Sequence, residues 1–166
     1  MTRRSISRRA AVVTATALVA VATVTAGVSL AGQDSPQRAS KARIAGLFDT
    51  WNAALQTGDS RKVADLYAKD AVLLPTVSNQ IRTDRAEIVD YFDHFLQNKP
   101  VGKKVETIVT VLDDNSAVDT GVYEFTLTDH DTGEQRVVKA RYTYTYEKID
   151  GAWLIFNHHS SAMPEG

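Results

Sequence analysis

Residues 117–160, AVDTGVYEFTLTDHDTGEQRVVKARYTYTYEKIDGAWLIFNHHS, decide the fold of this chain. Large apolar or aromatic side chains alternate with smaller or polar ones through most of the stretch, and a period of two is typical of strands. Asp150-Gly151 is a strong signal for a tight hairpin turn, and a second turn falls at 130–133. With one more strand ahead of a turn at 113–116, the expected antiparallel strands cover residues 105–112, 117–128, 135–148 and 152–160.

The residues before 101 follow the helical period instead. One apolar stripe contains Ile44, Leu47, Phe48, Trp51 and Leu55. Gly58 follows this stripe as a C-terminal cap, and Thr83 is expected to cap the third helix. The expected helices cover 39–57, 60–67 and the stretch from 84 to before Pro100, and a short strand at 71–74 is expected to pair with 79–82. Three N-terminal helices on a strongly curved, mostly antiparallel sheet make an α+β fold shaped like a cone.

The charges are unevenly distributed along the chain. The first 31 residues carry four arginines and no acid, whereas the rest carries 15 basic and 20 acidic residues, a net charge of −5. A body of this charge without a basic run argues against nucleic acid and anionic membranes as partners. The chain has no cysteine, which excludes disulfides and thiolate catalysis, and its four histidines form no zinc-ligand pattern. No nicotinamide or flavin fingerprint is present, so neither cofactor nor metal is expected.

The N-terminal segment has the pattern of an export signal. Arginines in residues 3–9 precede an apolar run from Ala10 to Leu30, and Ser29-Leu30-Ala31 fits a cleavage site for small residues. The Thr-Arg-Arg-x-Ile-x-Arg string favours the twin-arginine route. Residues 1–31 are therefore expected to be a signal peptide, 32–38 a flexible tail and 39–166 the folded domain. An ordinary signal with incidental arginines, or an uncleaved anchor, is the alternative.

Several short motifs in the body resemble one known family. They are Asp150-Gly151-Ala152-Trp153-Leu154-Ile155, the ending His158-His159-Ser160-Ser161-Ala162-Met163-Pro164, and Leu73-Leu74-Pro75-Thr76. The chain resembles, over about residues 40–165, bacterial relatives of the calcium/calmodulin-dependent protein kinase II association domain. The resemblance implies the SnoaL-like, ketosteroid-isomerase-like cone fold, which is also that of nuclear-transport-factor-like proteins, and a homo-oligomer. It does not imply kinase activity, because the chain has no kinase domain.

Strand parity indicates which side chains point into the cone. The faces that carry Tyr123, Tyr144 and Trp153 are expected to point inward. Asp119 shares the Tyr123 face, where burial could raise its pKa and make it a general base, or where water or a backbone N–H could simply satisfy it. On the last strand, His159 is expected to point into the pocket, as a base or as a hydrogen-bonded core residue.

Aromatic side chains dominate the expected interior and suit a small, flat, mostly apolar ligand. The candidate ligand-binding residues are Trp51, Tyr67, Arg82, Tyr91, Tyr123, Tyr142, Tyr144 and Asn157. Two alternatives remain: these rings fill the cone by themselves, and Arg82 forms a surface salt bridge with an acid such as Asp84. Animal association domains, by their resemblance, have arginines where this chain has Tyr123, Tyr144 and Ser160, which puts the binding of small carboxylates in doubt.

The outer face of the sheet is the expected interface. Val137, Leu154, Phe156 and His158 are predicted to point away from the cavity, where a symmetry mate would cover them. Two function classes follow from the sequence. The favoured one is a non-enzymatic assembly or binding module, and the other is a small SnoaL-type or ketosteroid-isomerase-type enzyme using Asp119 or His159 as general base.

Overall fold

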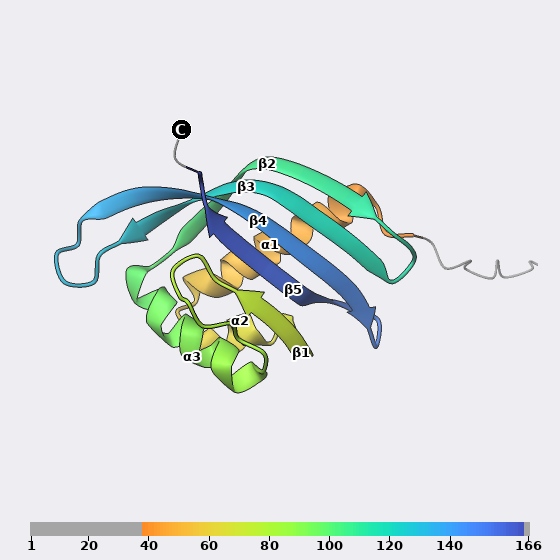
Figure 1. Ribbon diagram of the computed structural model, residues 1–166, viewed down its shortest axis with the longest axis horizontal. Coiled ribbons are helices and arrows are strands. Elements are labelled where there is room, and N and C mark those ends of the chain that lie inside the picture. Colours follow the sequence, from red (N-terminus) through yellow and green to blue (C-terminus); the bar gives the residue numbers. More distant parts are fainter. Residues whose placement is uncertain (1–37, 165–166) are drawn as a thin grey trace, which may run out of the picture. The chain divides into compact units, whose positions relative to one another are not determined.

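The computed structural model describes residues 38–164, which form a layer of helices beneath one curved sheet (Figure 1). The helices are α1 (Lys41–Gln56), α2 (Ser60–Ala64), α3 (Arg85–Phe95) and the 3-10 helix η1 (Leu96–Asn98). The strands are β1 (Tyr67–Leu74), β2 (Val101–Val111), β3 (Ser116–Thr128), β4 (Gln135–Ile149) and β5 (Ala152–Ala162). The predicted signal peptide and residues 32–37 of the predicted tail lie outside the described residues.

The sheet has the strand order β1-β5-β4-β3-β2. All neighbours are antiparallel except β1 and β5, which pair in parallel. The three α-helices lie on the concave side of this sheet, and within residues 38–164 nothing covers the opposite face (Figure 1). The α+β prediction with a strongly curved, mostly antiparallel sheet is confirmed.

Local signals place the helix ends. Ser40 accepts a hydrogen bond from the Arg43 amide and caps α1, while Gly58 follows its end with a φ of +70°. The predicted cap of α3 is wrong by one residue: Asp84, not Thr83, accepts from the Glu87 amide. The Glu87 carboxylate in turn accepts from the Thr83 amide at 2.8 Å. The two acids thus provide hydrogen-bond acceptors for two backbone N–H groups at the start of α3.

The region after α2 differs from the sequence prediction. The second helix ends at Ala64 rather than at residue 67, and β1 begins at Tyr67 rather than at residue 71. The reason is the parallel partner, because Tyr67 lies opposite Ile155 of β5 and tertiary pairing outweighs the local helical pattern. The pairing of Leu73 with Arg82 is confirmed as an isolated antiparallel bridge.

A bulge in β5 changes which histidine points inward. Thr145 of β4 lies opposite Asn157 and Tyr146 lies opposite Ile155, so Phe156 is an extra residue in β5. Beyond it the alternation shifts by one. His158 is 3 % exposed inside the fold and His159 is exposed, so the predicted placements of both, with Asn157 inward, are wrong.

A second bulge bends β2 over β3. Lys104 lies opposite Tyr123 and Glu106 lies opposite Val122, which leaves Val105 unpaired. The backbones approach so closely here that a Cβ on Gly121 would lie 1.9 Å from the Glu106 carbonyl oxygen. Only glycine fits at this position, and the bend lets the sheet arch over α1.

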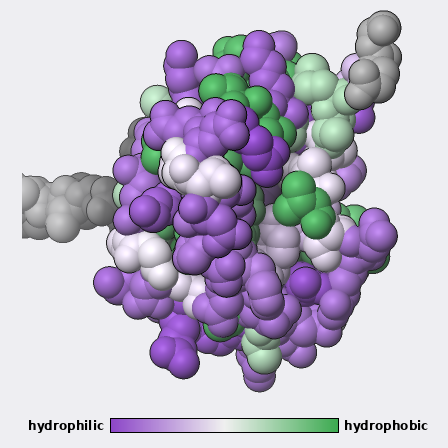
Figure 2. Space-filling model, turned by 90° about the vertical axis from the view of Figure 1, so that its left-hand side faces the viewer, coloured by the Kyte–Doolittle hydropathy of each residue, from purple (hydrophilic) through white to green (hydrophobic). Residues whose placement is uncertain are grey.

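Aromatic side chains fill the space between helices and sheet. Trp51 of α1 lies at the centre, with ring centroids of Phe92, Phe125 and Tyr144 within 6.2 Å. The Tyr123 and Tyr142 rings stack with centroids 4.9 Å apart. Seen from the left-hand side of Figure 1, the surface is mostly hydrophilic, with hydrophobic side chains in small groups (Figure 2). No helix within residues 38–164 has the length and apolar character to cross a membrane.

Candidate functional site

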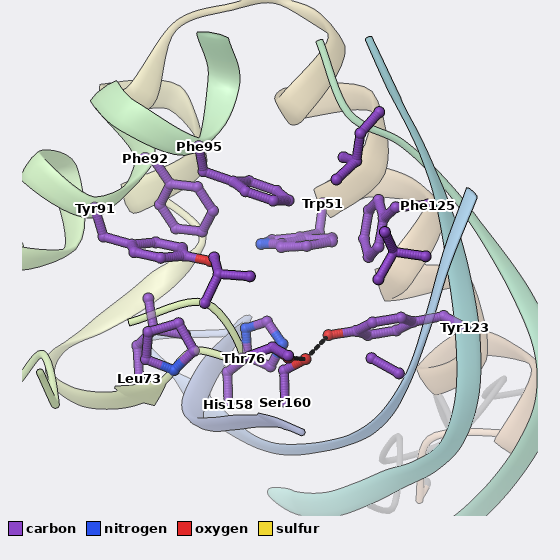
Figure 3. A pocket seen from close by; sticks show the side chains of 15 residues that line it. Trp51, Leu73, Thr76, Tyr91, Phe92, Phe95, Tyr123, Phe125, His158 and Ser160 are labelled. Atoms are coloured by element: carbon purple, nitrogen blue, oxygen red, sulfur yellow. Dashed lines mark hydrogen bonds between the residues drawn. The ribbon is translucent and has the colours of Figure 1, made fainter. Parts of the chain in front are cut away.

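A small apolar cavity opens at the end of the aromatic core, between α3 and the sheet (Figure 3). Its volume is about 60 Å³. Ligand pockets for drug-sized molecules measure roughly 300–1,000 Å³, so the chain's own rings occupy most of the cone. The lining residues labelled in Figure 3 are Trp51 of α1, Leu73 of β1, Thr76 of the loop that follows it, Tyr91, Phe92 and Phe95 of α3, Tyr123 and Phe125 of β3, and His158 and Ser160 of β5.

The predicted ligand-binding residues divide into two groups. Trp51, Tyr91 and Tyr123 line the cavity. Tyr67, Tyr142 and Tyr144 are buried in the core but do not line it. Asn157 does not line it either, because the β5 bulge turns it to the other face.

His158 lies at the floor of the cavity, and a chain of hydrogen bonds orients its ring. The Trp51 indole Nε1–H donates to the Tyr67 hydroxyl at 3.2 Å, and that hydroxyl lies 2.9 Å from His158 Nδ1. The indole can only donate, so the Tyr67 oxygen accepts from it, and the Tyr67 O–H has no acceptor among residues 38–164 other than Nδ1, to which it therefore donates. In the neutral ring, the proton of His158 is therefore on Nε2, and Nε2 has no hydrogen-bond partner among residues 38–164.

The titratable groups that line the cavity are uncharged at neutral pH. Burial, with a smaller contribution from the neighbouring His159, lowers the pKa of His158 to about 3. Burial also raises the pKa of Tyr91 and of Tyr123 well above the usual value of a phenol. A cavity with these walls attracts no ion by charge, and its polar groups are the neutral His158 ring and several hydroxyl groups.

Ser160 supplies the second polar position, which the sequence did not identify as a site. The Tyr123 hydroxyl donates to Ser160 Oγ, and Thr76 Oγ1, from the loop after β1, bonds to the same oxygen (Figure 3). Predicting that Ser160 points inward requires the pairing of β5 with β4, because Ser160 shares the inner face with His158 only after the bulge at Phe156. Both hydroxyl partners belong to the wall, so Ser160 closes the cavity rather than leaving an open polar group.

Asp119 lies elsewhere in the core and does not line the cavity. It is completely buried, accepts a hydrogen bond from the Tyr142 hydroxyl at 3.0 Å, and has Lys104 Nζ 3.5 Å from its second carboxylate oxygen. Burial raises the pKa of Asp119, while Lys104 and the Tyr142 hydrogen bond oppose this shift. The sequence analysis missed Lys104, whose side chain turns inward at the β2 bulge and also donates to the Ala45 carbonyl.

Arg82 is buried rather than at the surface, and the acid that it pairs with is Asp90 rather than Asp84, which the sequence analysis gave as an example. Its Nη2 lies 3.7 Å from Asp90 Oδ2, and its guanidinium carbon lies 5.9 Å from the centroid of the Tyr91 ring. Arg82 lines a separate recess of about 380 Å³ that shares Tyr91 with the apolar cavity. The side chain is thus behind a wall of the cavity rather than in it.

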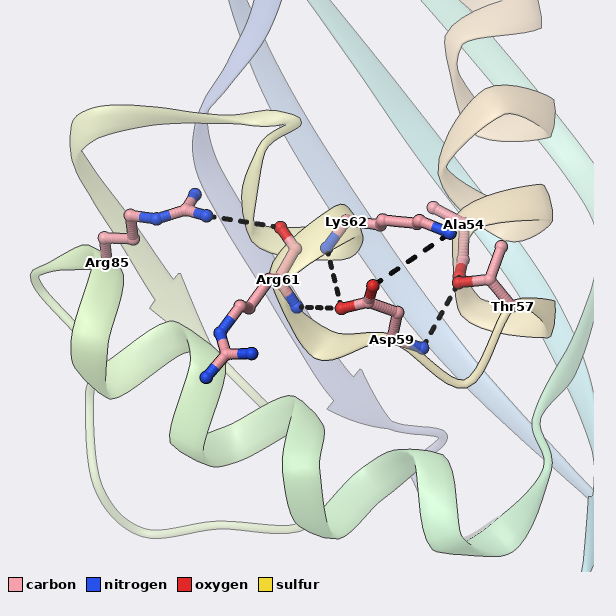
Figure 4. A network of polar contacts seen from close by, with 6 residues as sticks. All are labelled: Ala54, Thr57, Asp59, Arg61, Lys62 and Arg85. Carbon is pink, nitrogen blue, oxygen red and sulfur yellow. Dashed lines mark hydrogen bonds and ion pairs between the residues drawn. The ribbon is translucent and has the colours of Figure 1, made fainter.

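One further polar network has a structural role. The network of Figure 4 joins the helices: the Asp59 carboxylate accepts from the Arg61 amide at the start of α2, and Arg85 Nη2 donates to the Arg61 carbonyl at 3.4 Å. These groups are exposed and satisfy one another. Among residues 38–164, no three His, Asp or Glu side chains gather to hold a metal ion.

The uncovered face of the sheet carries the predicted interface only in part. Val137 is 61 % exposed there, and Leu154 and Phe156 are half-buried. His158 belongs to the opposite face, because the bulge at Phe156 shifts the alternation of β5 by one residue. Its assignment to the interface is therefore wrong. Exposed Ile108 lies on the same outer face, which the alternation of β2 around buried Val109 shows.

Comparisons with known proteins agree on the family and the fold. Residues 40–164 match the family model described as the calcium/calmodulin dependent protein kinase II association domain. A Xanthomonas campestris structure with the same family description is 62 % identical, with a TM-score of 0.73, covering 75 % of this chain and 88 % of that one. No curated protein matches the sequence significantly.

More distant solved structures share the fold alone. The association domain of the C. elegans kinase is 14 % identical, with a TM-score of 0.61, covering 74 % of this chain and 95 % of that one. A ketosteroid isomerase-like protein from Erwinia carotovora is 16 % identical, with a TM-score of 0.62, covering 75 % of this chain and 97 % of that one. The cone fold is therefore shared by association domains and by proteins described as enzyme-like.

Proposed function

The chain belongs to the calcium/calmodulin-dependent protein kinase II association domain family, and from this premise we propose that it is an exported, self-assembling binding module. Its small aromatic cavity would hold part of an apolar ligand, and the domain itself would catalyse no reaction. The proposal has three parts, namely export, self-association and ligand binding, and each can fail alone.

The observation that carries the binding role is the chemistry of the cavity wall. Acid–base catalysis needs a base and a donor that converge on one open space. Asp119 is completely buried beside Lys104 and away from the cavity, and His159 is on the exposed outer face. His158 does line the cavity, but a pKa of about 3 makes it a weak base at neutral pH. An apolar pocket with neutral hydrogen-bonding groups is the composition of a binding site.

Self-association is supported by the family and by the outer face of the sheet. Val137, Ile108 and the half-buried Leu154 and Phe156 are apolar side chains on a face that no part of residues 38–164 covers. A two-fold symmetric contact would bury this face on both copies at once. Dimers, alone or arranged in a ring, are the expected assembly.

Light scattering on the purified protein at micromolar concentration tests the assembly. We expect at least twice the mass of one chain, and we expect Phe156→Glu to lower it, because the new charge would be desolvated in an apolar contact. Gln80→Glu, at an exposed position in the loop between β1 and α3, is the control for added charge. A single-chain mass that does not change with concentration would rule out self-association.

The enzyme hypothesis is tested separately. The assignment of Asp119 or His159 as general base predicts that Asp119→Asn or His159→Gln abolishes turnover of any substrate found. The absence of turnover with ligands that bind supports the binding role, whereas turnover that survives both variants would mean an enzyme that uses another base and would contradict the binding role. Export rests on residues 1–31, and N-terminal sequencing of protein secreted by its host checks whether the mature chain begins near residue 32.

A further inference from the structure

The Nε2–H group of His158 is a buried hydrogen-bond donor without a partner within residues 38–164. The ring is 3 % exposed and packs between Tyr144, whose ring centroid is 4.2 Å away, and the edge of Trp51 at 5.4 Å. Buried polar groups almost always have a hydrogen-bond partner, so an orphaned donor beside a cavity indicates what the cavity accepts.

The polarity of this donor is fixed by the chain of bonds behind it. Trp51 donates to Tyr67, and the only acceptor for the Tyr67 O–H among residues 38–164 is Nδ1, so Nε2 carries the hydrogen. In the other tautomer Nδ1–H would donate to Tyr67, and the buried Tyr67 O–H would be left without an acceptor. His158 Nε2–H is therefore a hydrogen-bond donor that a ligand could satisfy with an acceptor atom.

The other walls exclude an anion as that acceptor. The cavity has apolar and aromatic walls, and its titratable groups are neutral. The nearest guanidinium, Arg82, lines the adjoining recess and faces Asp90 instead. Moving a carboxylate into this cavity would cost its hydration without an opposite charge in return.

We propose that the cavity recognises an uncharged, mostly apolar ligand through one carbonyl or ether oxygen that accepts a hydrogen bond from His158 Nε2–H. This inference rests on the proposed binding function and specifies its ligand class. The cavity volume of about 60 Å³ is far below the roughly 300–1,000 Å³ of pockets for drug-sized molecules, so only a small ring or the carbonyl end of a longer molecule is enclosed. The rest of a longer ligand would leave past Val77 and Tyr91, which form the rim shared with the recess.

Three probes of similar size and shape test the proposal. Cyclopentanone has a carbonyl acceptor, methylenecyclopentane replaces the oxygen by CH₂, and cyclobutanecarboxylate is an anion. Titrations followed by two-dimensional NMR report on the Trp51 indole N–H and on the His158 ring nitrogens. We expect the ketone to bind about 5- to 50-fold more tightly than the hydrocarbon, because an unmade hydrogen bond leaves Nε2–H unsatisfied. We also expect the Nε2 resonance to shift with the ketone alone.

Variants connect the preference to His158. His158→Phe keeps an aromatic ring without the donor and should make the ketone and the hydrocarbon bind equally, whereas His159→Phe on the outer face should preserve the preference. If His158→Phe does not fold, the Nε2 shift in the unaltered protein still decides the matter.

The possible outcomes separate this inference from the proposed function. Equal binding of ketone and hydrocarbon to the unaltered protein would overturn the role of His158 while supporting the cavity as a binding site. Tighter binding of the carboxylate than of the ketone would overturn the inference and would indicate binding in the recess lined by Arg82 instead. Binding of none of the three would overturn the ligand-binding function, and this inference with it.

Discussion

His158 should make the protein sensitive to mild acid. Its pKa is about 3 in the folded chain, because burial disfavours the charged ring, and about 6.5 in the unfolded chain. Below pH 6.5, His158 binds a proton in the unfolded chain but not in the folded chain. The free energy of unfolding therefore falls as the pH falls towards 3. Between pH 7 and pH 4.5 this linkage amounts to about 2.5 kcal/mol.

Urea denaturation at these two pH values measures the loss. With an m-value of about 1–3 kcal/mol per molar, the midpoint should move down by about 0.8–2.5 M. Asp113 and Asp129 accept hydrogen bonds that lower their pKa values, so their stabilisation is lost only below about pH 4, outside this window. Asp119 acts with the opposite sign, since its raised pKa favours folding as the pH falls.

Matched variants isolate the histidine, because all other groups titrate alike in each protein. His158→Phe should lower stability at pH 7, since Tyr67 loses its acceptor, but should remove the 2.5 kcal/mol of pH dependence estimated above. His159→Phe, one residue along and exposed, should retain it. The reasoning about burial would be refuted if His158→Phe lost as much stability between the two pH values as the unaltered protein.

Three other predictions concern the fold and export. Gly121→Ala should lower the free energy of unfolding by about 1–3 kcal/mol, since its Cβ would lie 1.9 Å from a backbone oxygen, whereas Gly46→Ala in α1, with nothing within 4 Å, should raise it by up to about 1 kcal/mol in the same urea assay. Lys104→Met should cost about 2–4 kcal/mol by leaving Asp119 buried without its cation, and adding Asp119→Asn should recover part of that loss. Replacing Arg3-Arg4 by two lysines should block secretion if the chain uses the twin-arginine route, and secretion that continues unchanged would contradict that route.

Local patterns in the sequence predicted most of the fold. The apolar stripe of α1 and the glycine after it are confirmed, as is the tight turn at Asp150-Gly151, where both residues have positive φ. These features depend on neighbouring residues, whose spacing is visible in the chain. The helical stripe correctly predicted Trp51 in the cavity wall, and strand parity correctly predicted Tyr123 there, because no bulge interrupts the pairing of β3 with β4.

The errors arose where distant segments meet. The parallel partner of β1 comes from the end of the chain, so the early start of that strand at Tyr67 has no local signal. The bulge at Phe156 depends on how β5 fits against β4, and a single unpaired residue reversed the assignments of His158 and His159. The partner of Asp119 was missed for the same reason, since Lys104 turns inward only at a bulge in another strand.

The unpaired Phe156 also determines which positions of β5 are sensitive to mutation. Before it, inward positions are odd-numbered, as at buried Ile155, and after it they are even-numbered, as at His158 and Ser160. A saturation scan of this strand should therefore show sensitivity at every second residue, with a half-period slip at position 156. Deleting that one residue would place Ile155 next to Asn157 and make the alternation continuous, with His158 still on the inner face and His159 still on the outer face.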